Sequence, residues 1–381
     1  MIARMIERID EIAPADWDGL LSRTNGVPDN PFSRYDFLWA LEASGCATGA
    51  TGWQPQHVVI ERENKLLGAM PLYLKSHSQG EYVFDFGWAD AFERAGGRYY
   101  PKLQCAIPFT PASAPKFLTR PGMEELRPEL LATAEQIARG NNISSVHATF
   151  LSEPELQLAE DRNWLTRLDT QFHWENQSFA DFDQFLETLS SRKRKAIRKE
   201  RNSVAESGVN IVWKQGSDIV EADWDDFFTF YMDTGSRKWG QPYLNREFFS
   251  LVTERMADQI VLMFAYRNGS AVAGALNFLG SDTLFGRYWG CTEHVPFLHF
   301  ELCYYQAIDY AIAHKLPRVE AGAQGEHKLA RGYAPAVTRS AHFITHPGLR
   351  DAVAKYLEAE RRSVLRNNEI LADYAPFKKN G

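Results

Sequence analysis

The sequence has 381 residues, of which 44% are hydrophobic, 13% aromatic and 24% charged, and its net charge is −7. This composition is typical of a soluble globular protein and excludes a disordered, collagenous or coiled-coil chain. At roughly 150 residues per domain, the length predicts two or three domains. The net charge argues against a surface built throughout for nucleic acid, although a local basic patch is compatible with it.

Targeting and cysteine patterns indicate an ordinary intracellular enzyme or binding protein. No apolar run is long enough to span a membrane, and Glu7, Asp10 and Glu11 interrupt the apolar core that a signal peptide would need. We therefore expect a cytoplasmic protein. The cysteines are too far apart for a zinc site or a disulfide framework, so reduced thiols are expected; they are Cys46, Cys105, Cys291 and Cys303.

The chain contains a loose internal repeat with a spacing of about 200 residues. Residues 56–89 form three strand-like runs joined by short turns, and residues 259–292 show the same three runs with turns at matching places. In this alignment Gly68 corresponds to Gly274, and Trp88 to Trp289. Each segment predicts a three-strand antiparallel meander, although many unrelated mixed domains also contain one.

Similar elements follow each meander. In the first half the pattern predicts a helix at 123–139, a strand at 143–150, a helix at 153–163 and a strand at 165–174. In the second half it predicts a helix at 297–315, strands at 318–323 and 336–344, and a last amphipathic helix from 349 to about 371. The sequence therefore predicts an α+β chain of two similar units, residues 1–175 and 176–381, with mixed, mainly antiparallel sheets flanked by helices.

The densest charge lies between the two halves. Residues 182–207 are helical by composition and end at Gly208, a suitable C-cap, and seven of the ten residues from Arg192 to Arg201 are Lys or Arg. Helical spacing places several cations on one face, namely Arg194, Arg198 and Arg201 with Lys195 and Lys199 beside them. Phosphate is the expected partner because arginine binds phosphate oxygens bidentately, but a solvated helix face is an equally good interpretation.

Familiar catalytic motifs are absent, whereas residues 286–333 are unusual. There is no G-x-S-x-G, no P-loop, no G-x-G-x-x-G after a strand and no H-E-x-x-H, and His299 and Glu301 point in nearly opposite directions on a helix, which argues against a metal. The helix that begins near Pro296 is apolar on almost every side, so Glu301 needs a partner or a function. A polar, glycine-spaced loop follows the strand at 318–323, as is common at functional sites.

Arg287-x-x-Gly290-x-Thr292 resembles the pyrophosphate-binding turn of the GNAT acyltransferase superfamily, which usually has Gly or Ala where this chain has Thr292. The stretches NPFSRYDFLWALE, YWGCTEHVPFLHFELCYYQAIDYAI and VEAGAQGEHKLARGY resemble the FemAB-like N-acyltransferases, which have two GNAT-like units in tandem. This resemblance covers nearly the whole chain. It implies transfer of an aminoacyl group from aminoacyl-tRNA, or an acyl group from acyl-CoA, to an amine of a cell-wall or peptide precursor, without a permanently bound cofactor or a metal.

The resemblance also assigns provisional roles to residues. Donor binding is expected at Arg287, Trp289, Gly290, Cys291 and Thr292 and on the basic helix at Arg194, Lys195 and Arg198. Candidates for the base that takes the ammonium proton are Glu301, Glu320, Glu326 and His327, among which we favour Glu326 and His327, then Glu301. Structural ion pairs with Lys328 or Arg331 explain these acids at least as well. Cys291 invites a covalent intermediate, but no histidine motif supplies its base, so an inert thiol is preferred.

Substrate contacts are expected in the second unit and at a groove between the units. The candidates are Arg34, Asp36, Tyr99, Tyr100, His299, Glu320, Gln324, Lys328, Arg331 and Tyr333. A different interpretation is a non-catalytic protein that recognises peptidoglycan or peptide on the same fold, which Thr292 favours. RNA binding through Arg192–Arg201 alone is a third.

Overall fold

The computed structural model describes residues 1–21, 29–238, 242–322 and 325–378. The chain forms two compact units, each made of two segments. Unit 1 comprises Met1–Asp169 and Val337–Arg366, and unit 2 comprises Thr170–Ala336 and Asn367–Gly381. Strand β9 (Leu165–Glu175), strand β15 (Ala334–Ile344) and helix α12 (Pro347–Asp373) each contribute residues to both units.

Unit 2 contributes the order β10-β11-β12-β13-β14-β9 to an 11-stranded sheet. Its strands besides β9 are β10 (Asn210–Gln215), β11 (Ile260–Arg267), β12 (Ser270–Leu279), β13 (Thr283–Cys291) and β14 (Arg318–Glu320). Neighbouring strands are antiparallel except β13 and β14, which are parallel. The helices are α6 (Phe182–Thr188), α7 (Ser191–Glu206), α8 (Glu221–Lys238), α9 (Arg246–Met256), α10 (Leu298–Phe300) and α11 (Gln306–Ala313).

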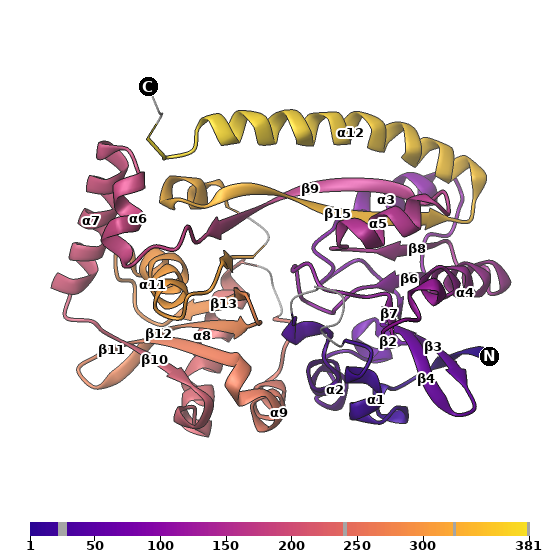
Figure 1. Cartoon of the computed structure of the whole chain (residues 1–381), viewed down its shortest axis with the longest axis horizontal. Coiled ribbons are helices and arrows are strands. Elements are labelled where there is room, and N and C mark those ends of the chain that lie inside the picture. The colour runs from indigo at the N-terminus through magenta and orange to yellow at the C-terminus, as the bar shows by residue number, and fades with distance from the viewer. Residues whose placement is uncertain (22–28, 239–241, 323–324, 379–381) are drawn as a thin grey trace. The chain divides into compact units, whose positions relative to one another are not determined.

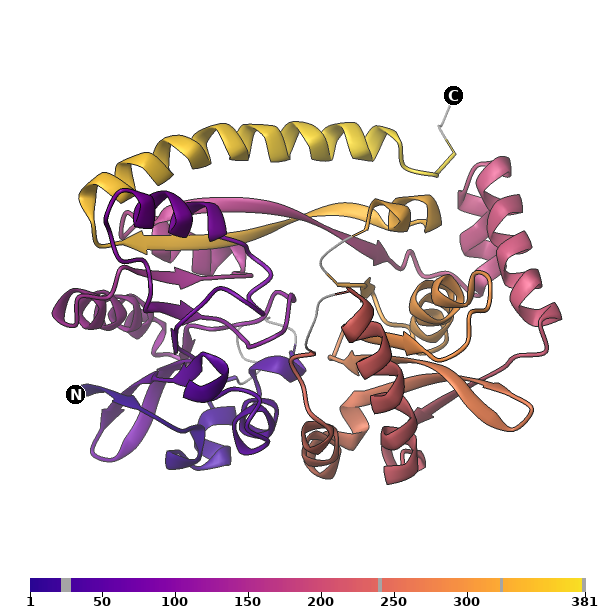
Figure 2. The ribbon, with the colours of Figure 1, turned by 180° about the vertical axis from the view of Figure 1, so that it is seen from behind.

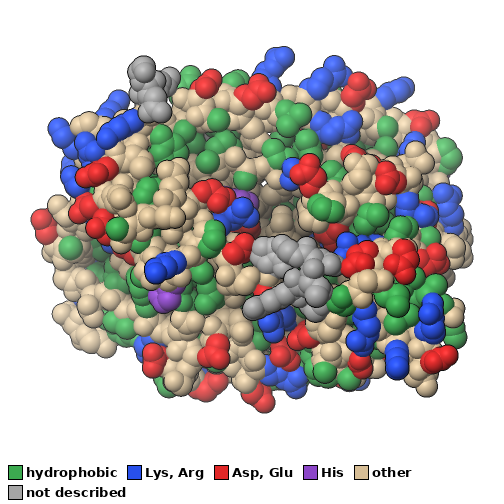
Figure 3. Space-filling model, in the orientation of Figure 1, with side chains coloured by type: hydrophobic (Ala, Val, Ile, Leu, Met, Phe, Trp, Pro, Cys, Tyr) green, Lys and Arg blue, Asp and Glu red, His purple; other side chains and the backbone are tan. Residues whose placement is uncertain are grey.

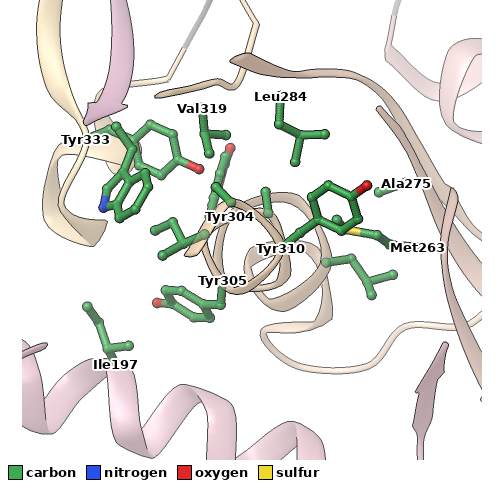
Figure 4. Close-up of a cluster of buried hydrophobic side chains, with 14 of the residues drawn as sticks. Ile197, Met263, Ala275, Leu284, Tyr304, Tyr305, Tyr310, Val319 and Tyr333 are labelled. Carbon is green, nitrogen blue, oxygen red and sulfur yellow. The ribbon is translucent and has the colours of Figure 1, made fainter. Parts of the chain in front are cut away.

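Strand alternation divides the two faces of this sheet between two groups of helices. Val261 and Met263 of β11 pack in the core that contains α11, whereas Phe264 contacts Phe230 of α8 on the other face. Figures 1 and 2, seen from opposite sides, show α11 on one face of the sheet and α8 on the other. Figure 4 shows tyrosines that radiate from the segment 298–313 and pack against the sheet and α7.

Past β9 the strand order of the same sheet continues as β15-β8-β6-β5-β2, strands that lie wholly or mainly in unit 1, and unit 1 also contains a small sheet of order β1-β3-β4-β7. Its other strands are β1 (Ile2–Ile6), β2 (Trp53–Pro55), β3 (His57–Arg62), β4 (Lys65–Met70), β5 (Tyr73–Lys75), β6 (Lys102–Cys105), β7 (Leu118–Thr119) and β8 (Ser145–Ala148). Its helices besides α12 are α1 (Pro14–Asp18), α2 (Tyr35–Ala43), α3 (Phe86–Arg94), α4 (Arg127–Gly140) and α5 (Glu153–Glu160). As in unit 2, a helix links two parallel strands, here β6 and β8 through α4.

The predicted α+β architecture is confirmed, and the meander of the second half is confirmed as β11-β12-β13. The prediction of a meander at residues 56–89 is wrong for its third strand, because residues 86–94 form helix α3. Trp88 lies in this helix and Trp289 in strand β13, so the two residues are not equivalent. The segment ADAFER that follows Trp88 consists largely of helix-forming residues, and this local preference outweighs the alternation before it. Strands β3 and β4 also lie in the small sheet rather than beside β5.

The boundary between the units differs from the prediction. The sequence division assigned everything after residue 175 to the second unit, whereas Val337–Arg366 belongs to unit 1. This segment belongs to unit 1 because its strand β15 pairs with β8 and its helix α12 buries Val353 and Leu357 beside Trp88. The predicted basic helix is also interrupted at Leu189–Ser190, which separates α6 from α7.

In the parts of the chain that the structure describes, no helix is long and apolar enough to cross a membrane.

Candidate functional site

The main feature of unit 2 is a fork between two parallel strands. β13 and β14 pair over only three positions, from Thr283 opposite Arg318 to Phe285 opposite Glu320. There β14 ends, while β13 continues to Cys291. β13 has a β-bulge at this point, because the adjacent residues Leu276 and Asn277 of β12 lie opposite Tyr288 and Gly286, which are two positions apart. Bulges of this kind redirect side chains and often accompany functional sites.

A cavity of about 110 Å³ opens at the fork. Its walls come from β12, β13, the helical segment after β13 and the residue after β14, namely Ala275, Leu276, Asn277, Gly286, Arg287, Tyr288, Trp289, His299, Cys303, Tyr304 and Ala321. The lining combines apolar and aromatic surface with a few polar groups, which is the usual composition of a small-molecule site.

A π-helical turn, Glu301–Tyr305, determines which side chains of the buried helix reach this cavity. Cys303 and Tyr304 line the cavity, while the carboxylate of Glu301 accepts hydrogen bonds from Arg201 at 3.1 Å and Gln306 at 2.8 Å. Burial raises the pKa of Glu301, and Arg201 opposes the shift. The structure therefore places Glu301, a predicted base, in a buried ion pair with α7, and it is not among the described residues that line the cavity.

His327 and Tyr304 form a hydrogen-bonded pair beside the fork. The Tyr304 hydroxyl lies 2.7 Å from Nε2 of His327, and the ring of His299 packs against both residues and against Trp289. His327 is exposed, whereas Tyr304 is buried. Tyr333, a predicted substrate contact, is fully buried against the Tyr304 ring, and burial raises its pKa well above the usual range. Tyr333 therefore supports the pair from the core.

The two cations of the glycine-rich loop have different environments. Lys328 is 2% exposed and its Nζ donates to the carbonyl of Gly322 at 2.9 Å; burial lowers its pKa to about 8. Arg331 binds both carboxylate oxygens of Glu200 at 3.0 and 3.1 Å and donates to the carbonyl of His327 at 2.8 Å. Arg331 is thus a structural link, and Lys328 is the cation close to the fork.

Glu320 lies at the base of the fork, where β14 ends. It is 6% exposed, and burial raises its pKa to about 8. Of the predicted base candidates with a described side chain, Glu320 and His327 therefore lie beside the fork. Gln324 lies outside the described residues, and the same holds for the side chain of Glu326.

The predicted pyrophosphate-binding turn is a strand in the structure. Residues 287–291 belong to β13, and the N–H of Thr292 donates to the carbonyl of Val272 at 3.0 Å, so part of this backbone serves the sheet ladder. Gly290 packs against helix α8, because a Cβ there would lie 2.1 Å from the carbonyl oxygen of Phe230. The next helical residue is Leu298, so no helix N-terminus directly follows Gly290. The absence of a side chain at Gly290 is therefore explained by packing.

Helix α7 has a cationic outer face and an ion-paired inner face. Arg201 turns inward to Glu301 and Asp309, and Arg198 pairs with the exposed Asp183. In the described part of the chain no ion-pair partner lies at the remaining cations, which are Arg192, Lys193, Arg194, Lys195 and Lys199. Figure 3 shows Lys and Arg side chains gathered over the region of α7.

The predicted contacts from the first half all lie in unit 1. Arg34 pairs with Asp29, and Asp36 is in the first turn of α2. Tyr99 is fully buried and donates to Asp85 at 2.6 Å, while the Tyr100 hydroxyl lies 2.8 Å from Ser78. Tyr99 therefore belongs to the core of unit 1.

The sequence did not point to Cys303, Tyr304, Glu200 or His173. His173 is the one with a local signal, since it is a polar residue between Phe172 and Trp174 in a strand. The importance of the other three depends on neighbours that are distant in sequence, such as Arg331 for Glu200.

Three solved structures share the fold over most of the chain. FemX is 11% identical in sequence, and the alignment covers 93% of this chain and 100% of FemX with a TM-score of 0.54. L-PGS from Bacillus licheniformis is 9% identical, and the alignment covers 93% of this chain and 98% of L-PGS with a TM-score of 0.56. A conserved protein of unknown function from Bacteroides thetaiotaomicron is 12% identical, and the alignment covers 91% of this chain and 100% of that protein with a TM-score of 0.53. Among curated proteins, none has a matching sequence.

The tandem GNAT-like architecture, with a parallel strand pair bridged by a helix in each unit, is thereby confirmed. The FemAB-like family, described as peptidoglycan biosynthesis/recognition, matches residues 8–379. This match spans nearly the whole sequence, and the chain belongs to the FemAB-like family.

Proposed function

We propose that unit 2 transfers an acyl or aminoacyl group from an activated donor, an acyl-CoA or an aminoacyl-tRNA, to an amine acceptor by direct attack. The observation that carries this proposal is the fork, where separating strands open a cavity lined by exposed strand edge and polar side chains. The family description supports a cell-wall or peptide precursor as the acceptor.

The donor carbonyl has two sources of electrostatic stabilisation at the fork. Because the N–H of Thr292 points to β12, alternation turns the N–H of Trp289 to the opposite side, where β13 borders the cavity. Lys328 holds its ammonium group against Gly322, the second residue after β14. Positive charge and N–H groups fixed at this place stabilise the negative charge that develops on the carbonyl oxygen during attack.

The Tyr304–His327 pair is suited to proton delivery. It connects the buried wall of the cavity with an exposed imidazole over a single hydrogen bond of 2.7 Å. A proton can therefore pass from solvent through His327 and Tyr304 to the leaving oxygen or sulfur of the donor. The sequence favoured His327 as a base for the ammonium proton, whereas the role proposed here is that of an acid for the leaving group.

A recognition protein without turnover is the second candidate. It is favoured by one observation, namely that the residues of the predicted pyrophosphate turn form a regular strand whose N–H at Thr292 is already bonded. The cations on α7, in contrast, favour a phosphate-bearing donor and hence a transferase.

The deciding experiment measures binding of acetyl-CoA, a longer acyl-CoA and charged tRNA to the purified protein, side by side at two salt concentrations. We expect saturable binding of one donor class, followed by product formation with an amine, and loss of that product in His327→Ala with an unchanged melting temperature. Absence of binding to all three donors would contradict the transferase and support recognition.

A further inference from the structure

Glu320 and His173 face each other on adjacent strands at the base of the fork. They are partners in the antiparallel register of β14 and β9, and Glu320 Oε1 lies 3.9 Å from His173 Nδ1. Their strand neighbours Val319 and Trp174 point into the core that contains α11. By alternation, Glu320 and His173 occupy the opposite face of the sheet.

When Glu320 is ionised, this pair presents hydrogen-bond acceptors to the same place. In the described structure Glu320 Oε2 is buried without a hydrogen-bond partner. His173 Nε2 lies 3.4 Å from Gln171 Oε1, an acceptor, which assigns the proton to Nε2 and leaves Nδ1 as an acceptor toward Glu320. A separation of 3.9 Å is too long for a direct hydrogen bond, but one donor atom can lie about 2.9 Å from both. A group with two or more N–H bonds, such as an amine, fits this arrangement.

The pair adjoins the cavity of the proposed reaction. Glu320 is followed directly by Ala321, and its partner Phe285 is followed by Gly286, and both of these next residues line the cavity. A Cβ at Gly286 would lie 3.5 Å from the carbonyl oxygen of Glu320. This distance places the backbone of Glu320 beside a residue that lines the cavity.

Burial keeps both groups neutral in the free protein, although charged groups lie around them. The neighbours that act on them are Arg318 on β14, Glu175 on β9, Asp282 before β13, Arg287 on β13 and Lys328 in the loop after β14. Arg318 is already paired with Glu175 at 2.8 Å, so burial dominates, and it raises the pKa of Glu320 to about 8 and lowers that of His173 to about 3. An ammonium group beside Glu320 would favour the carboxylate.

We infer that Glu320 and His173 form the acceptor site for a primary amine, and that Glu320 takes the proton which the amine loses on attack. The inference rests on the proposed function. The amine nitrogen forms a bond to the donor carbonyl carbon, and the C–O or C–S bond to the donor breaks. Before attack, the bound ammonium passes one proton to the Glu320 carboxylate and from there to solvent. After attack, the nitrogen loses a second proton by the same route, while the leaving atom takes a proton from the Tyr304–His327 pair, which solvent restores.

The first test is an infrared titration of the protonated carboxyl band, assigned by its absence in Glu320→Gln. The probes are Nα-acetyl-lysine amide and, as matched control, Nα-acetyl-norleucine amide, which lacks only the amine. We expect the band to disappear with a midpoint near pH 8 in the free protein, and at least one pH unit lower with saturating lysine probe. No protonated carboxyl above pH 6, or an equal shift with both probes, would overturn the inference.

The second test uses variants and the donor found in the binding experiment. Glu320→Gln should lower kcat at least 100-fold, and His173→Gln should raise KM for the amine about 10-fold. Glu358→Gln, which changes an exposed carboxylate on α12, should alter both constants less than twofold. A Glu320→Gln enzyme that keeps more than a tenth of kcat would overturn the inference and leave the proposed function intact.

The pH dependence of folding stability tests the raised pKa of Glu320 without an activity measurement. Because the folded pKa of Glu320 is raised, the native state holds a proton that the unfolded state loses, so wild-type stability falls as the pH rises from about 4.5 to about 8. Glu320→Gln mimics the protonated acid and should lack this fall, while its melting temperature at pH 5 matches wild type. If no donor binds but the lysine probe still shifts the titration, the transferase proposal fails and the amine site stands.

Discussion

Arg331 is a buried cation whose role is decided by its contacts. Its guanidinium lies 3.4 Å from the ring centroid of Phe300, binds both oxygens of Glu200 and holds the backbone of His327. Tyr305 donates to the same Glu200 carboxylate. Arg331 therefore fixes the loop that carries His327 against α7 and the π-helical turn.

Replacing Arg331 should leave Glu200 as an unpaired, largely buried charge. Arg331→Met should therefore lower the free energy of unfolding by about 3 kcal/mol, measured by urea denaturation. The matched substitution Arg198→Met removes an ion pair whose partners are both more than half exposed, and it should cost less than about 0.5 kcal/mol. An equal decrease in the free energy of unfolding in the two variants would show that Arg331 is not a structural link.

At the scale of elements, α7 separates two functions on two faces. Its inner residues Glu200 and Arg201 hold the glycine-rich loop and the π-helical turn, while its outer cations have no ion-pair partner among the described residues. The sequence placed Arg201 on the phosphate-binding face, and the structure assigns it to the inner face. The basic residues of α7 form one charged run in the sequence, but they differ in role, because only some of them form ion pairs with buried carboxylates.

The outer face of α7 should bind the phosphates of the donor. Replacing Arg194, Lys195 and Lys199 together by Gln should weaken donor binding at least tenfold. If the donor is RNA, the slope of log affinity against log salt should also become shallower by about 0.7 for each phosphate that is no longer neutralised. Binding measured at several salt concentrations checks this.

The control for α7 replaces three cations of α12, Lys355, Arg362 and Arg366, by Gln. A donor affinity unchanged in the α7 variant, or equally reduced in the control, would contradict the role of α7.

At the scale of the whole molecule, each unit is completed by a segment from the far end of the chain. Val337–Arg366 gives unit 1 its strand β15 and most of α12. Asn367–Gly381 belongs to unit 2, where Phe377 packs against the core and the N–H of Lys378 donates to the carbonyl of Thr188. The two units therefore cannot be separated by one cut.

A fragment of residues 1–175 should not fold cooperatively, because β8 lacks its partner β15 and the apolar surface around Trp88 lacks α12. The same fragment joined by a Gly/Ser linker to residues 337–366 should show a sigmoidal urea transition by circular dichroism. A cooperative transition of 1–175 alone would contradict the observed division.

The local sequence pattern was sufficient to predict much of the fold. The alternation in 260–291 predicted β11, β12 and β13, the glycine at 208 marked the end of α7, and the apolar helix after Pro296 is buried as expected. These features depend on neighbours within a few residues, so the sequence alone carries them. The polar residues between the glycines of the loop after β14 are also visible without a structure, and the function of this loop stays a prediction.

The sequence by itself determined the tandem α+β architecture and most of the polar residues near the fork; the tertiary structure decided what each of them does. Glu301 and Arg331 are held in buried ion pairs, whereas Glu320 meets His173 and keeps an unpartnered oxygen. The same side chains were indistinguishable in sequence, because ionisation and hydrogen bonding depend on burial and on partners far away along the chain. The assignment of Val337–Arg366 to unit 1 has the same cause, since strand pairing joins residues nearly 200 positions apart, as His147 and His342 show.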